Sequence, residues 1–184
     1  MEEPMERIKR INRQLVKEGN ILDIYEDTML LPNGEIEKWD FVSHRMGAAC
    51  VVAVMDDGKI ILVRQYRPAI ERETLELPAG KRDSQTEDTV VCAKRELEEE
   101  TGYTCNNIEL LIRLNTTVAF CDEFIDVYLA TGLKKIGEQH LDDAEDIVVI
   151  AYDIDTLLDK IYSCEIRDSK TVAGILAYIT KRAK

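Results

Sequence analysis

The stretch Gly80–Tyr103, GKRDSQTEDTVVCAKRELEEETGY, gathers acidic residues immediately before a glycine, and four of its last eight residues are glutamates. Ser84 and Glu87 have the spacing of a capping box, which marks the start of a helix. Gly102 is the residue type that most often ends one. We therefore predict a helix from about Thr86 to Thr101.

Three of these glutamates share one face of the predicted helix. Glu96, Glu99 and Glu100 follow the i, i+3, i+4 spacing, whereas Glu98 lies roughly opposite Glu96. Like charges at this spacing cost a few tenths of a kcal/mol per pair, and the nearby C-terminal end of the helix dipole adds to the cost. One interpretation is a solvated acidic face, as most charge runs are. The other is a site for a hard divalent cation, and spacing alone leaves both open.

The composition narrows the class of protein. The chain has 184 residues, 45% of them apolar and 33% charged, as in one soluble domain with or without a small appendage. No apolar run approaches the ~20 residues of a membrane helix, and the N-terminus lacks an apolar signal-peptide core, so we expect a cytoplasmic protein without a membrane partner. A net charge of −12 disfavours binding to nucleic acid. It would also repel a phosphate substrate unless bound cations reverse the local field.

The rest of the chain combines strand and helix patterns. The apolar spacing of Met5–Glu18 predicts a short amphipathic helix. Asn33-Gly34 and Asp57-Gly58 each separate two strand-like runs and supply the positive φ angles of a hairpin turn. Strands are predicted later at 108–117, 123–133 and 146–154, and helices at 153–166 and 168–184. This order predicts an α+β layered domain.

The opening stretch as a whole resembles the Nudix box, the loop-helix signature of Nudix hydrolases. The matching positions are, in order, Gly80, Glu87, Arg95, Glu96, Leu97, Glu99, Glu100, Gly102 and Tyr103. The departure within the box is one extra residue in the loop between Gly80 and Glu87, where an insertion is tolerated. The resemblance implies an α/β/α sandwich around a mixed β-sheet.

The same resemblance implies the metal ligands. Glu96, Glu99 and Glu100 would hold divalent ions, Mg²⁺ or alternatively Mn²⁺, and the backbone carbonyl of Ala79 would join them. Bound ions would remove the repulsion that the glutamates otherwise suffer.

Residues 27–35, 62–81 and 168–179 resemble the ADP-ribose pyrophosphatase group of this family. Members of that group hydrolyse nucleoside diphosphate sugars, which implies conversion of ADP-ribose to AMP and ribose 5-phosphate. They are usually homodimers whose N-terminal strands pair across the dimer and help to bind the nucleobase. We therefore expect residues 1–45 to serve dimerisation and base contacts, and residues 46–184 to form the hydrolase domain.

Two arginines and a glutamate are candidate substrate-binding residues. Arg64 and Arg67 suit a diphosphate because a guanidinium group makes bidentate contacts to phosphate. Arg67 matches the position of the group that contacts substrate, whereas Arg64 is equally well explained as a solvated strand residue. Glu76 matches a position near substrate or metal, and its neighbours Leu75 and Leu77 argue against a simple surface charge.

The resemblance also assigns loop carboxylates and aromatic residues. Asp143 and Glu145 match acidic residues of a mobile loop that activate the attacking water and bind metal, and with Glu99 they are the candidate catalytic residues. A solvated loop carboxylate is the alternative for each. Tyr25 and Trp39 are candidates for stacking on the base, with packing at an interface as the alternative.

One departure concerns the substrate. The group carries a proline and a glycine in a turn where this chain has Val118 and Ala119. GDP-mannose or another nucleoside diphosphate sugar therefore stays open as the substrate. A Nudix-fold sensor that binds such a sugar without cleaving it is a further alternative, although the complete set of box glutamates favours an enzyme.

Overall fold

The computed structural model describes residues 7–141 and 146–183 of the chain. The chain divides into two compact units, Met1–Met46 with Thr117–Glu123 and Gly47–Thr116 with Phe124–Lys184. Each unit has its own β-sheet, three-stranded in the first and seven-stranded in the second. Among the described residues, no helix is long and apolar enough to span a membrane.

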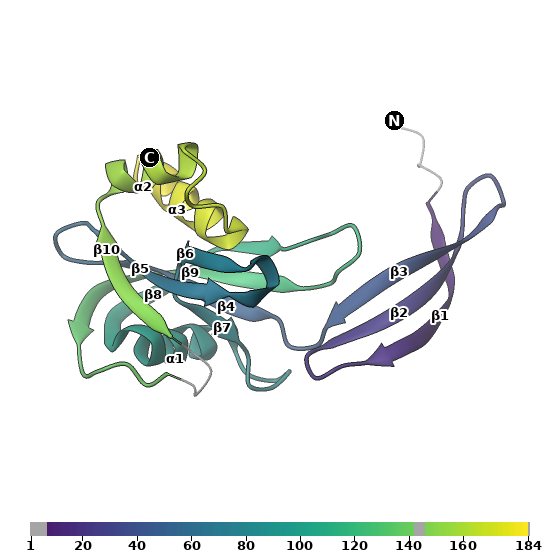
Figure 1. The fold of residues 1–184 in the computed structure, drawn as a ribbon, viewed down its shortest axis with the longest axis horizontal. Coiled ribbons are helices and arrows are strands. Elements are labelled where there is room, and N and C mark those ends of the chain that lie inside the picture. The colour runs from purple at the N-terminus through teal and green to yellow at the C-terminus, as the bar shows by residue number, and fades with distance from the viewer. Residues whose placement is uncertain (1–6, 142–145, 184) are drawn as a thin grey trace. The chain divides into compact units, whose positions relative to one another are not determined.

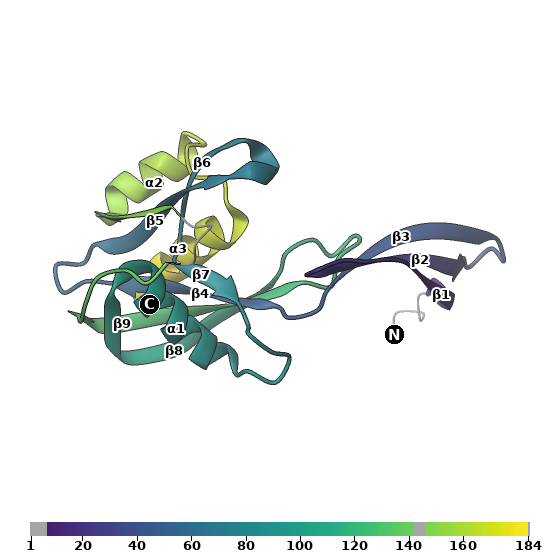
Figure 2. The ribbon, with the colours of Figure 1, turned by 60° about the horizontal axis from the view of Figure 1, so that its bottom comes forward.

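The first unit is built on an antiparallel sheet in the order β1-β2-β3 (Figure 2). Its strands are β1 (Lys9–Glu18), β2 (Leu22–Leu30) and β3 (Ile36–His44). The turn between β2 and β3 passes through Gly34, whose φ is 86°. Glycine adopts this left-handed conformation without steric cost, so the hairpin predicted at Asn33-Gly34 is confirmed.

The helix predicted over Met5–Glu18 is wrong for residues 9–18, which form strand β1. β1 pairs with β2 through two irregularities in register, between Arg10 and Asn12 and between Leu15 and Lys17. Each such bulge inserts one residue and so moves the following side chains to the other face of the sheet. The apolar residues therefore recur at spacings of three and four, which imitate a helix although the backbone is extended.

The second unit is a mixed sheet in the order β10-β5-β4-β9-β8, with β6 beside β5 and β7 beside β4. β4 and β9 are parallel, and the other pairs are antiparallel. A turn through Gly58, at a φ of 85°, joins β4 to β5 and confirms the second predicted hairpin. The strands are β4 (Ala48–Val54), β5 (Ile60–Arg67), β6 (Arg72–Glu76), β7 (Ala79–Lys81), β8 (Tyr103–Asn115), β9 (Phe124–Lys135) and β10 (Ile147–Tyr152).

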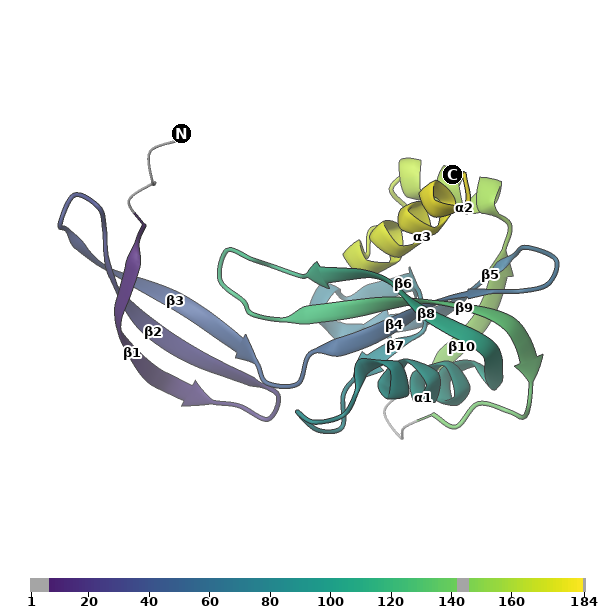
Figure 3. The same ribbon diagram turned by 180° about the vertical axis from the view of Figure 1, so that it is seen from behind.

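Helices cover both faces of this sheet, with α1 (Thr89–Thr101) on one face and α2 (Ile154–Tyr162) and α3 (Ser169–Arg182) on the other (Figures 1 and 3). Alternate residues of β4 enter two separate cores. Ala49, Val51 and Ala53 pack with Cys92, Ala93 and Leu97 of α1, while Cys50, Val52 and Val54 pack with Leu157 and Ile175. A strand buried on both faces reads as a continuous apolar run. The predicted α/β/α sandwich around a mixed sheet is confirmed.

Gly174 allows α3 to lie close to the sheet and to the segment that follows β6. A Cβ atom at this position would lie 2.8 Å from Leu77 Cδ1 and 3.1 Å from Val127 Cγ1, closer than ordinary packing permits. The close approach brings the first turn of α3 to the polypeptide between β6 and β7.

Candidate active site

Helix α1 carries the glutamates of the opening stretch and begins later than predicted. Its N-cap is Asp88, whose side chain accepts a hydrogen bond from the Val90 amide at 3.1 Å. Ser84 and Glu87 do form capping-type hydrogen bonds, but these close a turn in the preceding loop rather than the helix itself. At the other end Gly102 has a φ of 69°, and its amide donates to the Glu98 carbonyl. The predicted C-terminal end of the helix is therefore confirmed.

The first residue of α1 is held by a buried carboxylate on β9. Asp126, 1% exposed, accepts a hydrogen bond from Thr89 Oγ1 at 2.8 Å and two from Arg113, at 2.6 and 2.7 Å. Burial raises the pKa of Asp126, but the hydrogen bonds from Arg113 and Thr89 outweigh it and lower that pKa below its ordinary value. Thr89 also contacts the Tyr128 hydroxyl at 2.7 Å. The helix is thus anchored to the sheet at its N-terminal end.

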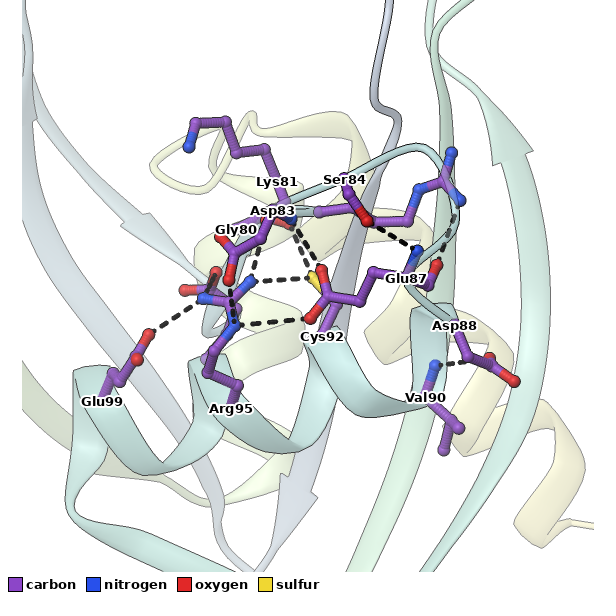
Figure 4. Close-up of polar contacts among 12 residues, drawn as sticks. Gly80, Lys81, Asp83, Ser84, Glu87, Asp88, Val90, Cys92, Arg95 and Glu99 are labelled. Atoms are coloured by element: carbon purple, nitrogen blue, oxygen red, sulfur yellow. Dashed lines mark hydrogen bonds and ion pairs between the residues drawn. The ribbon is translucent and has the colours of Figure 1, made fainter.

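Arg95 occupies the centre of the acidic face of α1 (Figure 4). Its Nη1 atom donates to Glu96 at 2.7 Å and to Glu99 at 3.0 Å, and its Nη2 atom donates to the Lys81 carbonyl at 3.0 Å. Burial lowers the pKa of Arg95, but the charge of Glu96 and the hydrogen bonds that Arg95 donates to Glu99 and Glu96 outweigh it and raise that pKa above its ordinary value. Arg95 therefore remains a cation and screens part of the repulsion among these side chains.

Strand β7 lies directly against the same carboxylates. Glu100 is 3% exposed and accepts a hydrogen bond from the Ala79 amide at 2.9 Å. A Cβ atom at Gly80 would overlap the carboxylate of Glu96, which is itself 9% exposed. A side chain at residue 80 would displace the Glu96 carboxylate, so glycine at this position leaves that carboxylate where it is.

The donor set on α1 fits a hard cation. Glu96 and Glu100 are buried carboxylates one helical turn apart, and Arg95 is the cation that bonds Glu96 and Glu99. Burying carboxylates is costly unless cations compensate them, and oxygen ligands are those that Mg²⁺ prefers. Among the described residues, no three acidic, histidine or cysteine side chains converge closely enough to hold a metal ion.

A second charged cluster joins β5, β6 and α3. Glu76, 3% exposed, accepts two hydrogen bonds from Arg67, both at 2.7 Å, and one from Lys170 at 2.5 Å. Thr74 adds a fourth at 2.6 Å. Burial raises the pKa of Glu76, but the Arg67 hydrogen bonds and the Lys170 charge outweigh it and lower the pKa to about 2. The charge of Glu100 also contributes to raising the pKa of Arg67, which links this cluster electrostatically to α1.

The segment between β6 and β7 is held by α3 on one face of the sheet and by α1 on the other. The Leu77 amide donates to Thr171 Oγ1 at 2.9 Å, and that hydroxyl donates to Asp168, the N-cap of α3, at 2.6 Å. Two residues further on, the Ala79 amide donates to Glu100 of α1. The polypeptide that carries the Ala79 carbonyl is thus fixed from both faces of the sheet.

The structure brings some of the predicted site residues together and leaves others apart. Arg67 and Glu76 are directly bonded. Arg64 lies three residues before Arg67 on β5, where an odd separation places side chains on opposite faces, and its ion-pair partner is Glu73 at 3.9 Å. Asp143 and Glu145 lie outside the described residues.

The two aromatic candidates belong to the sheet of the first unit. Tyr25 lies opposite Phe41 in the register of β2 and β3, with ring centroids 6.2 Å apart, and the guanidinium of Arg13 lies over both rings. Trp39 is 39% exposed, and its indole donates to Glu37 at 2.8 Å.

The sequence pattern did not identify Lys170 or Asp126 as part of these clusters. Lys170 lies on the first turn of α3, two residues after the N-cap Asp168. Lys170 is 9% exposed, and although burial lowers its pKa, the charges of Glu76 and Asp168 raise it above its ordinary value. A lysine this deeply buried is rare unless it is paired, but its partner is 94 positions away in the sequence.

Comparison with known proteins agrees with this fold. The NUDIX domain model matches residues 43–165. A methanol dehydrogenase activator from Bacillus methanolicus is 40% identical over 168 residues, covering 91% of this chain and 90% of that protein. ADP-ribose pyrophosphatases from Bacillus subtilis and Mycobacterium tuberculosis are 38% and 37% identical, covering 91% of this chain and 90% and 81% of those proteins. The crystal structure of an ADP compounds hydrolase superposes with a TM-score of 0.86 at 18% identity, covering 97% of this chain and 96% of that one.

The chain therefore belongs to the Nudix family, as the resemblance of its opening stretch predicted. Its activity class is that of a Nudix pyrophosphohydrolase, an enzyme that cleaves a phosphoanhydride bond with water.

Proposed function

We propose that the protein hydrolyses the pyrophosphate bond of a nucleoside diphosphate sugar, with ADP-ribose as the preferred substrate. Water adds to one phosphorus, the bridging P–O bond breaks, and the products are AMP and ribose 5-phosphate. The observation that carries the proposal is the placement of two buried carboxylates of α1, Glu96 and Glu100, against the segment that follows Glu76, the residue that holds Arg67. The two relatives named ADP-ribose pyrophosphatase support the choice of sugar.

Divalent cations, Mg²⁺ or alternatively Mn²⁺, would be held by Glu96, Glu99 and Glu100 with the Ala79 carbonyl. Such ions supply charge neutralisation of the diphosphate and acidify a bound water. Glu96 and Glu100 are already buried beside β7, on the face of α1 that would hold the ions. The Arg95 hydrogen bonds to Glu96 and Glu99 would have to open or shift.

Arg67 is the proposed contact for the substrate's diphosphate. Its Nε and Nη2 atoms are bonded to Glu76, and its side chain is 42% exposed. A guanidinium fixed along one edge presents its other N–H groups in a defined direction, which suits bidentate binding of phosphate. Arg64, 45% exposed, would contribute charge at longer range, and Glu76 would act on the substrate by orienting Arg67.

The proton acceptor for the attacking water is proposed among Asp143, Glu145 and Glu99, with Glu145 also a metal ligand. Asp143 and Glu145 carry this role by their match to the acidic loop of the group. A carboxylate close to a metal-bound water acts as a general base once that water is acidified.

The first unit is proposed to pair with a second copy of the chain. The described strands of this unit expose apolar side chains, including Ile11, Leu15, Val16 and Ile36 at 53%, 47%, 63% and 62%. Exposed apolar surface of this extent marks interaction sites. Residues 1–45 would then serve dimerisation and residues 46–184 hydrolysis, with Tyr25 and Trp39 available to contact a nucleobase.

A second candidate function is binding of the sugar nucleotide without cleavage, as a sensor. The observation that favours it is the relative at 40% identity that bears the name of an activator. Against it stands the complete set of glutamates on α1. GDP-mannose remains a candidate substrate, because Val118 and Ala119 stand where the ADP-ribose group has proline and glycine, and a GDP-mannose pyrophosphatase from Cronobacter sakazakii is 29% identical over 134 residues.

A phosphate-release assay coupled to a phosphatase tests the proposal, with ADP-ribose, GDP-mannose and UDP-glucose compared in the presence and absence of Mg²⁺. We expect metal-dependent turnover that is fastest with ADP-ribose. The double variant Glu99→Gln/Glu100→Gln should lose it at saturating Mg²⁺, whereas Glu98→Gln, an exposed position of the same helix, should not. Turnover that survives the double variant would contradict the ligand assignment. Metal-dependent binding without turnover would favour the sensor.

A further inference from the structure

The carboxylate of Glu76 has no capacity left for a substrate. Its Oε1 atom accepts from Arg67 Nε and Thr74, and its Oε2 atom accepts from Arg67 Nη2 and Lys170. A carboxylate offers about four lone-pair sites, and four donors fill them. Glu76 therefore orients its charged partners Arg67 and Lys170 and does not bind the substrate itself.

The cluster is balanced in charge by Lys170. Arg67 and Lys170 contribute two positive charges, and Glu76 and Asp168 contribute two negative ones, with Lys170 bonded to both carboxylates at 2.5 and 3.0 Å. Without Lys170 the four positions would carry a net negative charge. A diphosphate that approached Arg67 would then meet a repulsive field, because Glu76 is buried and water screens its charge little.

Lys170 is also placed to act without touching the ligand. It lies on the first turn of α3, is 9% exposed and bonds Glu76 Oε2, whereas the Arg67 side chain, which bonds both oxygens of the same carboxylate, is 42% exposed. In the described part of the chain, Arg67 has no hydrogen-bond acceptor other than Glu76. Lys170 neutralises part of the negative charge of Glu76. The positive charge of Arg67 is then less fully compensated by Glu76 and can attract an external anion.

We propose that Lys170 is a positioning residue that makes Arg67 available to the substrate's diphosphate, by sharing Glu76 and cancelling its charge. This rests on the proposed function, which assigns the diphosphate to Arg67. Lys170 thereby sets affinity for the substrate, while the chemical step belongs to the carboxylates of α1 and the acidic loop.

Steady-state kinetics of Lys170→Met test this role, with Lys170→Arg as the charge-conserving variant and Lys181→Met as the control. Lys181 belongs to the same helix and is ion-paired with Glu109 at 2.7 Å, at the far end of α3 from Glu76. Lys170→Met should raise KM roughly tenfold, the effect of one unit charge at close range in a partly buried site, with kcat within about threefold. Lys170→Arg should restore KM to within about threefold of the wild type, and Lys181→Met should leave it unchanged. A Lys170→Met variant that melts at lower temperature but keeps the KM of the control would overturn the proposal.

A second pair of variants covers the case in which Lys170→Met does not fold. In a Glu76→Gln background the buried carboxylate is gone, so loss of Lys170 no longer leaves Glu76 as an unpaired charge. Lys170 then has no Glu76 charge to cancel, so KM of Glu76→Gln/Lys170→Met should stay within about threefold of that of Glu76→Gln. A rise of about tenfold in this background, as large as that expected in the wild type, would show that Lys170 acts without Glu76 and would overturn the proposal.

Failure of the proposed function gives a different result. If the wild type hydrolyses none of the three sugars, the proposed function fails alone, and titration calorimetry with ADP and Mg²⁺ replaces KM. Weaker ADP binding by Lys170→Met than by wild type and Lys181→Met then supports the proposal. Equal affinities, including no binding by any of them, overturn it.

Discussion

Arg113→Met should destabilise the protein by about 3–5 kcal/mol, because it leaves a buried carboxylate without its cation. Asp126 is 1% exposed, and two of the three hydrogen bonds described for its side chain come from Arg113. The Arg113 side chain is itself 61% exposed, so removing one partner leaves a buried charge and removing the other leaves a solvated one. Asp126→Asn leaves a cation that water can solvate and should cost only about 1–3 kcal/mol.

Equilibrium unfolding in urea, with thermal unfolding alongside, measures this difference. For a chain of this size each kcal/mol of unfolding free energy moves the thermal midpoint by about 2–4 °C. Arg113→Met should therefore melt roughly 6–20 °C below the wild type. Lys181→Met breaks an exposed pair with Glu109 and should cost under about 1 kcal/mol.

The pH dependence identifies the cause. In the wild type the pKa of Asp126 is lowered, so its stabilising contribution is present above the ordinary pKa of 3.8 and is lost as pH falls through the lower folded value. In Arg113→Met burial dominates and raises that pKa, so acidification protonates the native state first and stabilises the variant. The difference between the two proteins should therefore shrink from pH 7 to pH 4. A loss under about 1 kcal/mol at pH 7, or a difference independent of pH, would refute this account of the pair.

Two further predictions follow from the site. Gly80→Ala should reduce metal-dependent kcat at least about tenfold, because the added methyl group overlaps the Glu96 carboxylate. Gly137→Ala is the control, since open space surrounds that position, and it should leave kcat unchanged. Equal kcat values for the two variants would contradict the prediction and show that Glu96 moves aside freely. Glu76→Gln should destabilise the protein equally from pH 8 to 5 and progressively less below pH 4.5, since the pKa of Glu76 is lowered from 4.5 to about 2 and its contribution is lost only as pH falls through that value. Urea unfolding as a function of pH measures this, and a cost that grows on acidification would contradict it.

Local signals predicted the features whose causes are local. The turns at Gly34 and Gly58 and the helix end at Gly102 all have positive φ, and a glycine between periodic segments predicts such a conformation. The start of α1 was misplaced because Ser84 and Asp88 are both good capping residues, and the sequence alone does not tell which of the two caps the helix.

Features that depend on partners distant in sequence were not predictable from periodicity. Strand β1 imitates a helix because its bulges follow from pairing with β2, which the pattern of β1 alone does not contain. Likewise Lys170 and Glu76 are 94 positions apart, and nothing near either residue signals the other. Glu76 and Arg67 were predicted as site residues by their match to positions of the family. That the two side chains bond each other directly is visible only in the fold. The roles of Asp143 and Glu145 stay predictions.

Helix α3 lies beyond residues 43–165, the part of the chain that the family model matches. Yet its first turn supplies Lys170 to the Glu76 cluster and Thr171 to the backbone of Leu77. A shortened protein that ended at the family boundary would keep every glutamate of the Nudix box and lose the support of the strand segment those glutamates rest against. We therefore expect that the smallest piece of this chain able to work as an enzyme is larger than the piece by which the family is recognised.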